Sequence, residues 1–443
     1  MKAYSYKDSD IEALGEAPSH WKNKRLVNIC DFIRGNSCFG KNDLLSEGKY
    51  VALQYGKTYK VESVNEQFNF YVNDEFYKSS QTVDYGDVIF VSTSETMEDL
   101  GHSVFYNRED IGLVGGEQIL LKPNRNVLDG KYLFYASKVF GSKLNKFATG
   151  IKVFRFDIYD LKTIYINLPP LKEQKIIADF LDKAIARIDR IISIKEEQID
   201  KLEDSVESKI KELVSLGLRG EKTKPTDIDW FSEIPESWRV IRLKAVLSKI
   251  GSGLTPKGGA ASYVDEGVPI IRSQNVKKYG LDLTDVVFIK EETHEKMQNS
   301  KVSNNDVLLN ITGASLGRVC LAEGIDEANV NQHVCIIRPF QFITPKFLYY
   351  LLYSEIGQAQ VFSSFKGSGR EGLNLEAIKS FRLPLPPSKS EQNEITDALD
   401  TLFTRATKLN QNINSQIKTL QNYRKSLIHE CVTGKKQVAD RAE

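Results

Sequence analysis

The sequence predicts an α+β protein with two homologous, strand-rich α/β domains, which are separated by a long antiparallel two-helix coiled coil and related by a pseudo-twofold axis. Three observations lead to this prediction. The chain repeats itself once along most of its length, each copy contains short β-like runs, and each copy ends in a long segment with helical periodicity. With 443 residues, 41% of them hydrophobic, the chain is long enough to bury several cores.

The duplication is marked by motifs that recur in the same order at a nearly constant offset. The strongest matches are Trp21 with Trp238, Asp87 with Asp306, Leu168–Pro170 with Leu385–Pro387, and Glu173–Gln174 with Glu391–Gln392. We therefore predict that each half is one structural unit. The expected segments are a first globular domain at 1–168, a first helix at 169–217, a linker at 218–235, a second globular domain at 236–386, a second helix at 387–434 and a tail at 435–443.

Short apolar runs in both globular parts predict strands. They lie at 50–55, 87–92, 118–123, 268–273, 306–311 and 333–339, and Gly, Asn, Asp and Ser separate them at close intervals. Buried helix is the alternative, but the runs are short and rich in β-branched residues, which favours strands.

Each Leu-Pro-Pro is followed by a helical pattern, and proline is well tolerated in the first turn of a helix. The second helix has alternating four- and three-residue spacing, which predicts a coiled-coil seam along Ile395, Leu399, Leu402, Ala406, Leu409, Ile413, Gln416, Leu420, Tyr423 and Leu427. The first helix offers Ile177, Leu181, Ala184, Ile188, Ile191 and Leu202, beside a stripe of Ile185, Ile192, Ile199, Val206 and Leu213. The alternative is two amphipathic helices, each packed only on its own domain.

The linker indicates how the two helices are oriented. Only about twenty residues separate the end of the first helix near 216 from the second domain. The second helix returns along the first only if the second domain lies at the far end. We therefore predict an antiparallel pair.

Composition limits the classes of function. Lys and Arg total 60 against 59 Asp and Glu, so the net charge of +1 does not by itself indicate a nucleic-acid binder, although local basic clusters are permitted. The five cysteines (Cys30, Cys38, Cys320, Cys335 and Cys431) have no zinc-like spacing and the five histidines no metal-binding motif. We expect reduced core thiols, no metal site and, because no apolar run is long enough to span a bilayer and no signal peptide is present, a cytoplasmic protein.

Two similar but unlike domains held apart by a rigid helical pair suit a reader of two short DNA sequences. Identical units would read a palindrome, whereas homologous but different units would read a split, asymmetric site. A scaffold that holds two protein partners apart is the alternative function.

Several segments resemble the specificity subunits of type I restriction-modification systems. The resemblance rests on LPPLKEQ at 168–174, LPPSKSEQ at 385–392, the helix ends LVSLGLRG and HECVTGKK, and the segments GSGLTPK (251–257), ITGASLGRV (311–319) and NVNQHV (329–334). It extends over almost the whole chain, in order and twice. The first domain departs from it at 34–42 and 92–101.

The resemblance implies that each globular domain is a target-recognition domain for one half of a bipartite DNA target, and that the helices set the spacer. It also implies partners: double-stranded DNA, two methyltransferase subunits that dock on the helical region, and two restriction subunits that carry motor and nuclease activities. The chain itself would be non-catalytic and hold no cofactor. S-adenosylmethionine, ATP and magnesium are expected on the partners, and adenine would be methylated there after base flipping.

Polar loops that differ between the halves supply candidate DNA-binding residues, because Arg, Lys, Asn and Gln read base edges or contact phosphates. The first half offers Arg34, Asn36, Lys41, Gln54, Lys57, Lys60, Lys146, Lys152 and Arg155. The second half offers Thr255, Lys257, Arg272, Ser273, Gln274, Asn275, Lys277, Lys278, Lys366 and Arg370. A solvated surface charge is the alternative for each. Arg272 to Asn275, directly after an apolar strand, are the strongest candidates.

A nuclease or methyltransferase site in this chain is the catalytic alternative. The sequence has no Asn-Pro-Pro-Tyr-like motif and no phosphate-binding GxxxxGK[ST] loop. Asp87 and Asp306 precede apolar runs and are expected to cap turns rather than to catalyse.

Overall fold

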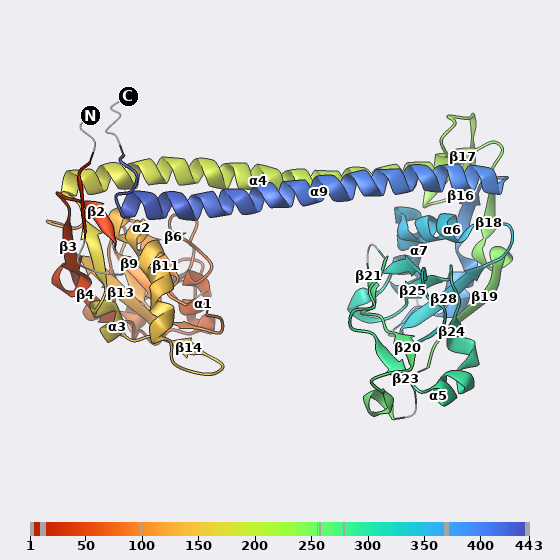
Figure 1. Cartoon of the computed structure of the whole chain (residues 1–443), viewed down its shortest axis with the longest axis horizontal. Helices are drawn as coiled ribbons and strands as arrows, with labels where there is room; N and C mark the ends of the chain where they lie inside the picture. The colour runs from red at the N-terminus through yellow and green to blue at the C-terminus, as the bar shows by residue number, and fades with distance from the viewer. Residues whose placement is uncertain are drawn as a thin grey trace. The chain divides into compact units, whose positions relative to one another are not determined.

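The computed structural model describes residues 4–8, 15–97, 100–254, 256, 258–277, 280–366 and 372–438. It divides into two compact units (Figure 1). Unit 1 comprises Met1–Lys195 and Ser415–Glu443, and unit 2 comprises Glu196–Asn414. Both boundaries fall inside the two long helices, α4 (Leu171–Leu216) and α9 (Lys389–Val432), so each unit contains a segment of each helix.

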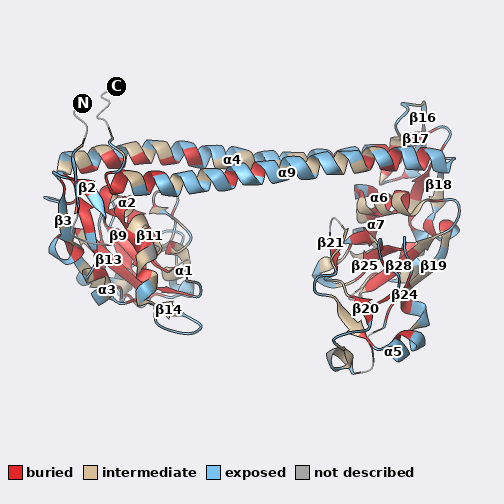
Figure 2. Cartoon of the chain, viewed as in Figure 1, coloured by how far each residue is buried: buried red, intermediate tan, exposed pale blue. Residues whose placement is uncertain are grey.

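Unit 1 is built on two mixed sheets. The first has the order β4 (Cys30–Arg34), β13 (Gln118–Pro123), β9 (Val88–Val91), β11 (Ser103–Tyr106) and β6 (Ser63–Val64). The second has the order β7 (Tyr71–Val72), β5 (Tyr50–Leu53), β12 (Gly112–Val114) and β8 (Thr82–Val83). Strand β3 (Lys22–Arg25) pairs with β15 (Tyr165–Leu168), which leads into α4. Every residue of β5 and β9 is buried, because their apolar runs lie in the core, and Figure 2 shows β9 in the buried colour.

Unit 2 repeats this plan. One sheet has the order β19 (Leu247–Ser252), β28 (Val334–Pro339), β25 (Val307–Asn310) and β26 (Val319–Leu321). The other sheet has the order β23 (Val287–Ile289), β20 (Val268–Ile271), β27 (Ala328–Val330) and β24 (Lys301–Val302). Strand β18 (Arg239–Arg242) pairs with β29 (Arg382–Leu385), just as β3 pairs with β15. The predicted strands and the internal duplication are confirmed.

Shorter elements complete both units. The helices are α1 (Tyr55–Thr58), α2 (Gly130–Phe140), α3 (Ile158–Lys162), α5 (Glu291–Lys296), α6 (Pro345–Tyr353), α7 (Glu355–Lys366) and α8 (Leu375–Ser380). The two-stranded pairs are β1 (Tyr6–Asp8) with β2 (Glu16–Pro18), β10 (Thr93–Ser94) with β14 (Phe154–Arg155), β16 (Thr223–Ile228) with β17 (Phe231–Pro235), and β21 (Val276–Lys277) with β22 (Gly280–Leu281). None of the described helices combines the length and apolar character needed to cross a membrane.

The repeated Trp and Glu-Gln motifs contact each other at the start of each long helix. Trp21 Nε1 donates a hydrogen bond to Glu173 Oε1 at 3.0 Å, and Trp238 Nε1 donates to Glu391 Oε1 at 2.9 Å. The neighbouring glutamine side chains accept backbone hydrogen bonds from the globular domains, Gln174 from Asp129 and Gln392 from Thr344. These motifs therefore fix the helix starts to the globular domains.

The two long helices pack against each other in both units, and they run antiparallel. In unit 1 the first turns of α4 (Ile177, Leu181, Ile188) share a core with the last turns of α9 (Leu427, Ile428, Cys431). In unit 2 the last turns of α4 (Val206, Ile210, Leu213) share a core with the first turns of α9 (Ile395, Leu399). The predicted antiparallel pairing is confirmed, and the alternative of two separate amphipathic helices is wrong.

The predicted seam is wrong in part. Leu409 and Tyr423 are 47% and 51% exposed, and Gln416 is exposed as well. Beyond Ala406 the buried line continues instead through Ile413, Ile417, Leu420, Leu427 and Cys431, with the half-buried polar residues Asn410 and Arg424 on the same line. The predicted seam is therefore off by one residue at every second position: Asn410, Ile417 and Arg424 lie on the inner line in place of Leu409, Gln416 and Tyr423.

A similar error affects the first helix, where Ile191 is 44% exposed and Ile192 lies on the inner side. Polar contacts also join the two helices near these positions. Arg424 Nε lies 3.1 Å from Asp189 Oδ1, and Lys195 donates a hydrogen bond to Gln416.

All five cysteines are free. Four are buried, as expected, and burial raises the pKa of Cys30, Cys320, Cys335 and Cys431 to about 12. Cys38 corrects the prediction of five core thiols, because it is exposed in the loop after β4.

The shifted seam gives a testable contrast between two residues of α9. Replacing the buried Ile417 by Ala should lower the free energy of unfolding by about 2 kcal/mol or more, because it leaves a cavity between the helices. Replacing the exposed Tyr423 by Ala should change it by less than about 0.5 kcal/mol. Urea unfolding followed by circular dichroism measures both changes, and a larger loss for Tyr423→Ala would contradict the seam.

Candidate nucleic-acid interface

The predicted loops of unit 1 begin along one edge of its sheets, where β4, β5, β9 and β12 end and β13 starts. Backbone hydrogen bonds hold these strand ends together: Gly35 N to Gln118 O at 2.9 Å, Gly115 N to Leu53 O at 3.0 Å, and Ser92 N to Glu117 O at 3.1 Å. We call this the first strand-end edge. Loops that are far apart in sequence therefore start close together in space.

The residues after β4 are exposed on this edge. Arg34 has a 63% exposed side chain, with Nη1 at 3.5 Å from Asp157 Oδ2. Asn36 is exposed, and its carbonyl oxygen accepts a hydrogen bond from Lys78 Nζ at 2.9 Å. Lys41 is exposed in a 3-10 turn. Lys78 is a cation of this edge that sequence reasoning missed, because it lies in a segment with no counterpart among the compared loops.

The loop after β5 contributes a second group. Gln54 precedes α1 and is half-buried, and Lys60 is exposed. The Lys57 Nζ lies 4.3 Å from the centre of the Phe70 ring, so this cation rests against an aromatic face.

The segment before the first Leu-Pro-Pro joins the same edge. Strand β14 pairs with β10, which places Arg155 opposite Thr93. The Arg155 side chain is 59% exposed, with Nη2 at 4.0 Å from Glu117 Oε1. Lys152 is exposed, and Lys146 Nζ lies 4.8 Å from the centre of the Phe147 ring.

Unit 2 has an equivalent second strand-end edge, where β19, β20, β25 and β27 end. Gly253 N donates to Asn331 O, and Asn331 N donates to Ile271 O, both at 3.1 Å. Asn310 Nδ2 donates to Ser273 O at 2.8 Å. The loop after β20 is thereby held at the end of β25.

The segment from Arg272 to Asn275 is a tight turn on this second edge. Asn275 is 2% exposed, and its side chain accepts a hydrogen bond from Arg272 N at 2.9 Å and donates one to Asp282 O at 2.9 Å. Arg272 Nη2 donates to Asp285 O at 2.7 Å. Ser273 is half-buried and Gln274 is exposed. Asn275 therefore supports the turn, whereas Gln274 is its most accessible side chain.

The remaining candidates of unit 2 are only partly described. Lys277 is exposed, with Nζ at 3.8 Å from Asp282 Oδ2. Lys366 is the last residue of α7, and its side chain is outside the described part. Thr255, Lys257, Lys278 and Arg370 lie outside the described residues.

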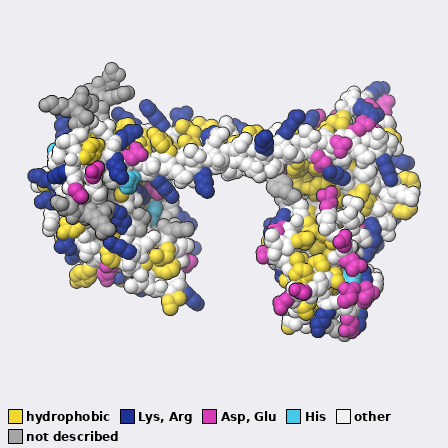
Figure 3. Space-filling model, viewed as in Figure 1, with side chains coloured by type: hydrophobic (Ala, Val, Ile, Leu, Met, Phe, Trp, Pro, Cys, Tyr) yellow, Lys and Arg dark blue, Asp and Glu magenta, His cyan; other side chains and the backbone are white. Residues whose placement is uncertain are grey.

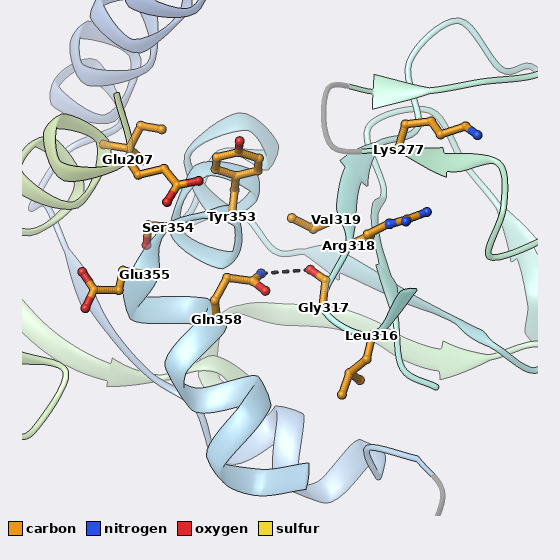
Figure 4. A pocket seen from close by; sticks show the side chains of 11 residues that line it. Glu207, Lys277, Leu316, Gly317, Arg318, Val319, Tyr353, Ser354, Glu355 and Gln358 are labelled. Atoms are coloured by element: carbon orange, nitrogen blue, oxygen red, sulfur yellow. Dashed lines mark hydrogen bonds between the residues drawn. The ribbon is translucent and has the colours of Figure 1, made fainter. Parts of the chain in front are cut away.

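A cavity of about 650 Å³ opens beside the second edge, between α4, α7 and the turn before β26 (Figure 4). Gln358 Nε2 donates a hydrogen bond to Gly317 O at 2.9 Å and fixes this turn. The exposed Arg318 and Lys277 both line the cavity. Sequence reasoning missed Arg318, although it lies within the segment ITGASLGRV that carries part of the family resemblance.

The paired aspartates are structural. Asp87 Oδ2 accepts a hydrogen bond from Asp84 N at 3.0 Å and lies 3.1 Å from Lys122 Nζ. Asp306 Oδ2 accepts from Ser303 N at 2.7 Å, while Oδ1 lies 2.7 Å from Arg338 Nε. Burial raises the pKa of Asp87. The expectation that both carboxylates cap turns is confirmed.

One group among the described residues, Glu291, His294 and Glu295, brings three potential metal-ligand atoms within 4.8 Å of one another. His294 is buried and its Nδ1 lies 2.5 Å from Asn329 Oδ1. On the face in Figure 3, acidic side chains gather where Figure 1 labels α5. This acidic region is unfavourable for phosphate contact.

Comparisons with known proteins identify a family and several relatives of this chain. A family model described as the type I restriction modification DNA specificity domain matches twice, at residues 18–204 and 235–419. The chain is 27% identical over 322 residues to the EcoBI specificity subunit of Escherichia coli, covering 71% of this chain and 67% of that protein. It is 24% identical over 427 residues to the MjaVIII specificity subunit of Methanocaldococcus jannaschii, covering 94% and 95%.

The fold is also similar to that of a chain in a solved structure on complex assembly and conformational transition of the type I R-M system. The TM-score is 0.72 at 17% identity, and the match covers 95% of this chain and 99% of that one. Since the family model covers most of the chain in two copies, the chain belongs to the family of type I restriction-modification DNA specificity domains.

Proposed function

We propose that the chain reads an asymmetric bipartite DNA target, with one half-site for each globular domain. The observation that carries this proposal is the presence of two strand-end edges with the same framework and different exposed side chains. Equivalent hydrogen bonds occur in the frameworks of both units: Tyr135 OH donates to Asp182 at 2.7 Å, and Tyr350 OH donates to Asp400 at 2.6 Å.

The exposed residues of the two edges differ. The first edge presents Arg34, Asn36 and Arg155, whereas the second presents Gln274 and Lys277. Arg and Lys suit guanine or phosphate, and Gln and Asn suit adenine. Two unlike sets of side chains on one framework favour two unlike half-sites over a palindrome.

We further propose that the helix pair fixes the gap between the half-sites. Helix α4 has 46 residues, and a rise of 1.5 Å per residue gives a length of about 70 Å. Its pairing with α9 through buried apolar residues in both units stiffens it. A stiff connection between two readers makes the gap a property of the protein.

The chemistry of restriction and modification would then belong to partners. We propose that two methyltransferase subunits dock on the helical region and that two restriction subunits complete the assembly. S-adenosylmethionine, ATP and magnesium would be bound by those subunits, and this chain would contribute recognition. Membership of the specificity-domain family supports this division.

Binding of the purified chain to mixed-sequence duplex DNA tests the proposal. The logarithm of the binding constant should fall linearly with the logarithm of the salt concentration, because cations on the two edges displace counterions from phosphates. Fluorescence anisotropy across a salt series measures the slope. A chain that binds no duplex at low salt would instead be a protein scaffold.

Gln274→Ala tests direct reading by the second edge. Sequencing of the duplexes that the protein selects from a random pool should show relaxed preference at one or two positions of one half-site, equivalent to about 1–3 kcal/mol per base pair. The half-site of unit 1 serves as the internal control. Equal weakening toward all sequences would show that Gln274 contacts phosphate.

Lengthening both helices tests the spacer. A heptad inserted after Lys195 in α4, with a matching heptad after Asn414 in α9, adds about 10 Å to the pair. The selected gap should grow by about three base pairs while both half-sites stay the same. An unchanged gap would contradict the proposed role of the helices.

A further inference from the structure

A short hairpin in unit 1 has features that the recognition of base edges does not explain. Residues 149–155 form the hairpin, and reciprocal backbone hydrogen bonds between Thr149 and Arg155, both 2.9 Å, close its base. Gly150 has φ +110°, and a Cβ at this position would lie 2.0 Å from the carbonyl oxygen of Val153. The turn therefore requires glycine and holds the tip in a defined conformation.

Ile151 occupies the tip and is 96% exposed. Its neighbour Val153 is 38% exposed, so the tip is apolar on the outside. A single exposed apolar residue is ordinary on a protein surface. The surroundings of Ile151 are what distinguish it.

Basic residues flank the tip in the sequence. Residues 141–155 contain Lys143, Lys146, Lys152 and Arg155 and no acidic residue. The side chains of Lys146, Lys152 and Arg155 are exposed. An apolar tip between exposed cations suits a surface that carries negative charge on its rim and apolar faces inside, as stacked base pairs between two phosphate backbones do.

The hairpin also stands on the first strand-end edge. Its strand β14 pairs with β10, and Arg155 lies beside Glu117, the residue just before β13. Figure 1 shows β14 on the side of unit 1 away from α4. Any duplex that contacts Arg34 and Arg155 on this edge is therefore within reach of the tip.

We propose that Ile151 inserts into a groove of the target duplex and wedges between base pairs, while Lys152 and Arg155 contact the flanking phosphates. This proposal rests on the proposed function, because it assumes that the first edge binds DNA. Insertion unstacks a base step and bends the duplex, which makes the deformability of that step part of the half-site.

Wedging by Ile151 and phosphate contact by Lys152 can be tested separately, because Ile151 carries no charge. Ile151→Ser should weaken binding to a duplex from the selected pool by about tenfold, as expected for a buried apolar side chain, with the salt dependence unchanged. Lys152→Ala should instead reduce the slope of that salt dependence by about one. Ile151 is almost fully exposed, so its replacement should leave the thermal stability of the chain unchanged.

The experiment combines anisotropy with 2-aminopurine, an adenine analogue that becomes brighter when it is unstacked, placed at successive adenines of the selected duplex. Wild-type protein should brighten one position, and Ile151→Ser should abolish that signal. Ile191→Ser, at an exposed isoleucine of α4, is the matched control and should leave both readouts unchanged.

Equal affinity and equal brightening for wild type and Ile151→Ser would overturn the wedge, with the proposed function intact. Unchanged DNA binding together with loss of co-purification with the methyltransferase subunit would also overturn it and show that the tip contacts protein. If wild type binds no duplex at all, the proposed function fails, and the wedge fails with it.

Discussion

Each globular domain is fixed to its long helix by a buried tryptophan that donates a hydrogen bond to a glutamate in the first turn of the helix. The tryptophans, Trp21 and Trp238, are each 1% exposed. About two and a half turns further along each helix, Asp182 and Asp400 each accept hydrogen bonds from a tyrosine hydroxyl and a lysine of the globular domain. Because these contacts join a sheet domain to a rigid helix, the loops at the strand ends have a defined orientation relative to the helix that carries them.

The duplication separates the residues that build this framework from the candidate DNA-reading residues at the strand ends. The junction contacts, the turn-capping aspartates and the sheet order recur in both units. The strand-end edges do not recur in detail: the first is rich in exposed arginine and lysine, and the second is organised around the turn at Asn275. The proposed reading of two different half-sites requires this combination of a shared framework and edges that differ in their exposed side chains.

Much of the fold follows from local sequence patterns. The buried strands and both long helices could be predicted because their apolar periodicity matches their burial. The seam beyond Ala406 could not be predicted in full, because the polar residues Asn410 and Arg424 occupy inner positions. The ion-pair partner of Arg424 is Asp189, which lies on the other helix. Cys38 was wrongly expected in the core, since a small apolar side chain in a loop gives no signal of exposure.

The sequence predicts the candidate site as a set of loops, but it does not predict how exposed each side chain in those loops is. Sequence comparison of the halves identified the loops, but the contrast between the buried Asn275 and the exposed Gln274 depends on hydrogen bonds across the turn. Lys78 and Arg318 reach the edges from other segments, which only the tertiary structure brings close.

The most direct test of two unlike readers joined by a stiff helical pair is to map methylated adenines in a genome. The host should express this chain together with the methyltransferase subunit of its system. The account predicts two different short sequences separated by a gap of constant length. A palindromic site, an uninterrupted block, or half-sites at variable spacing would contradict it.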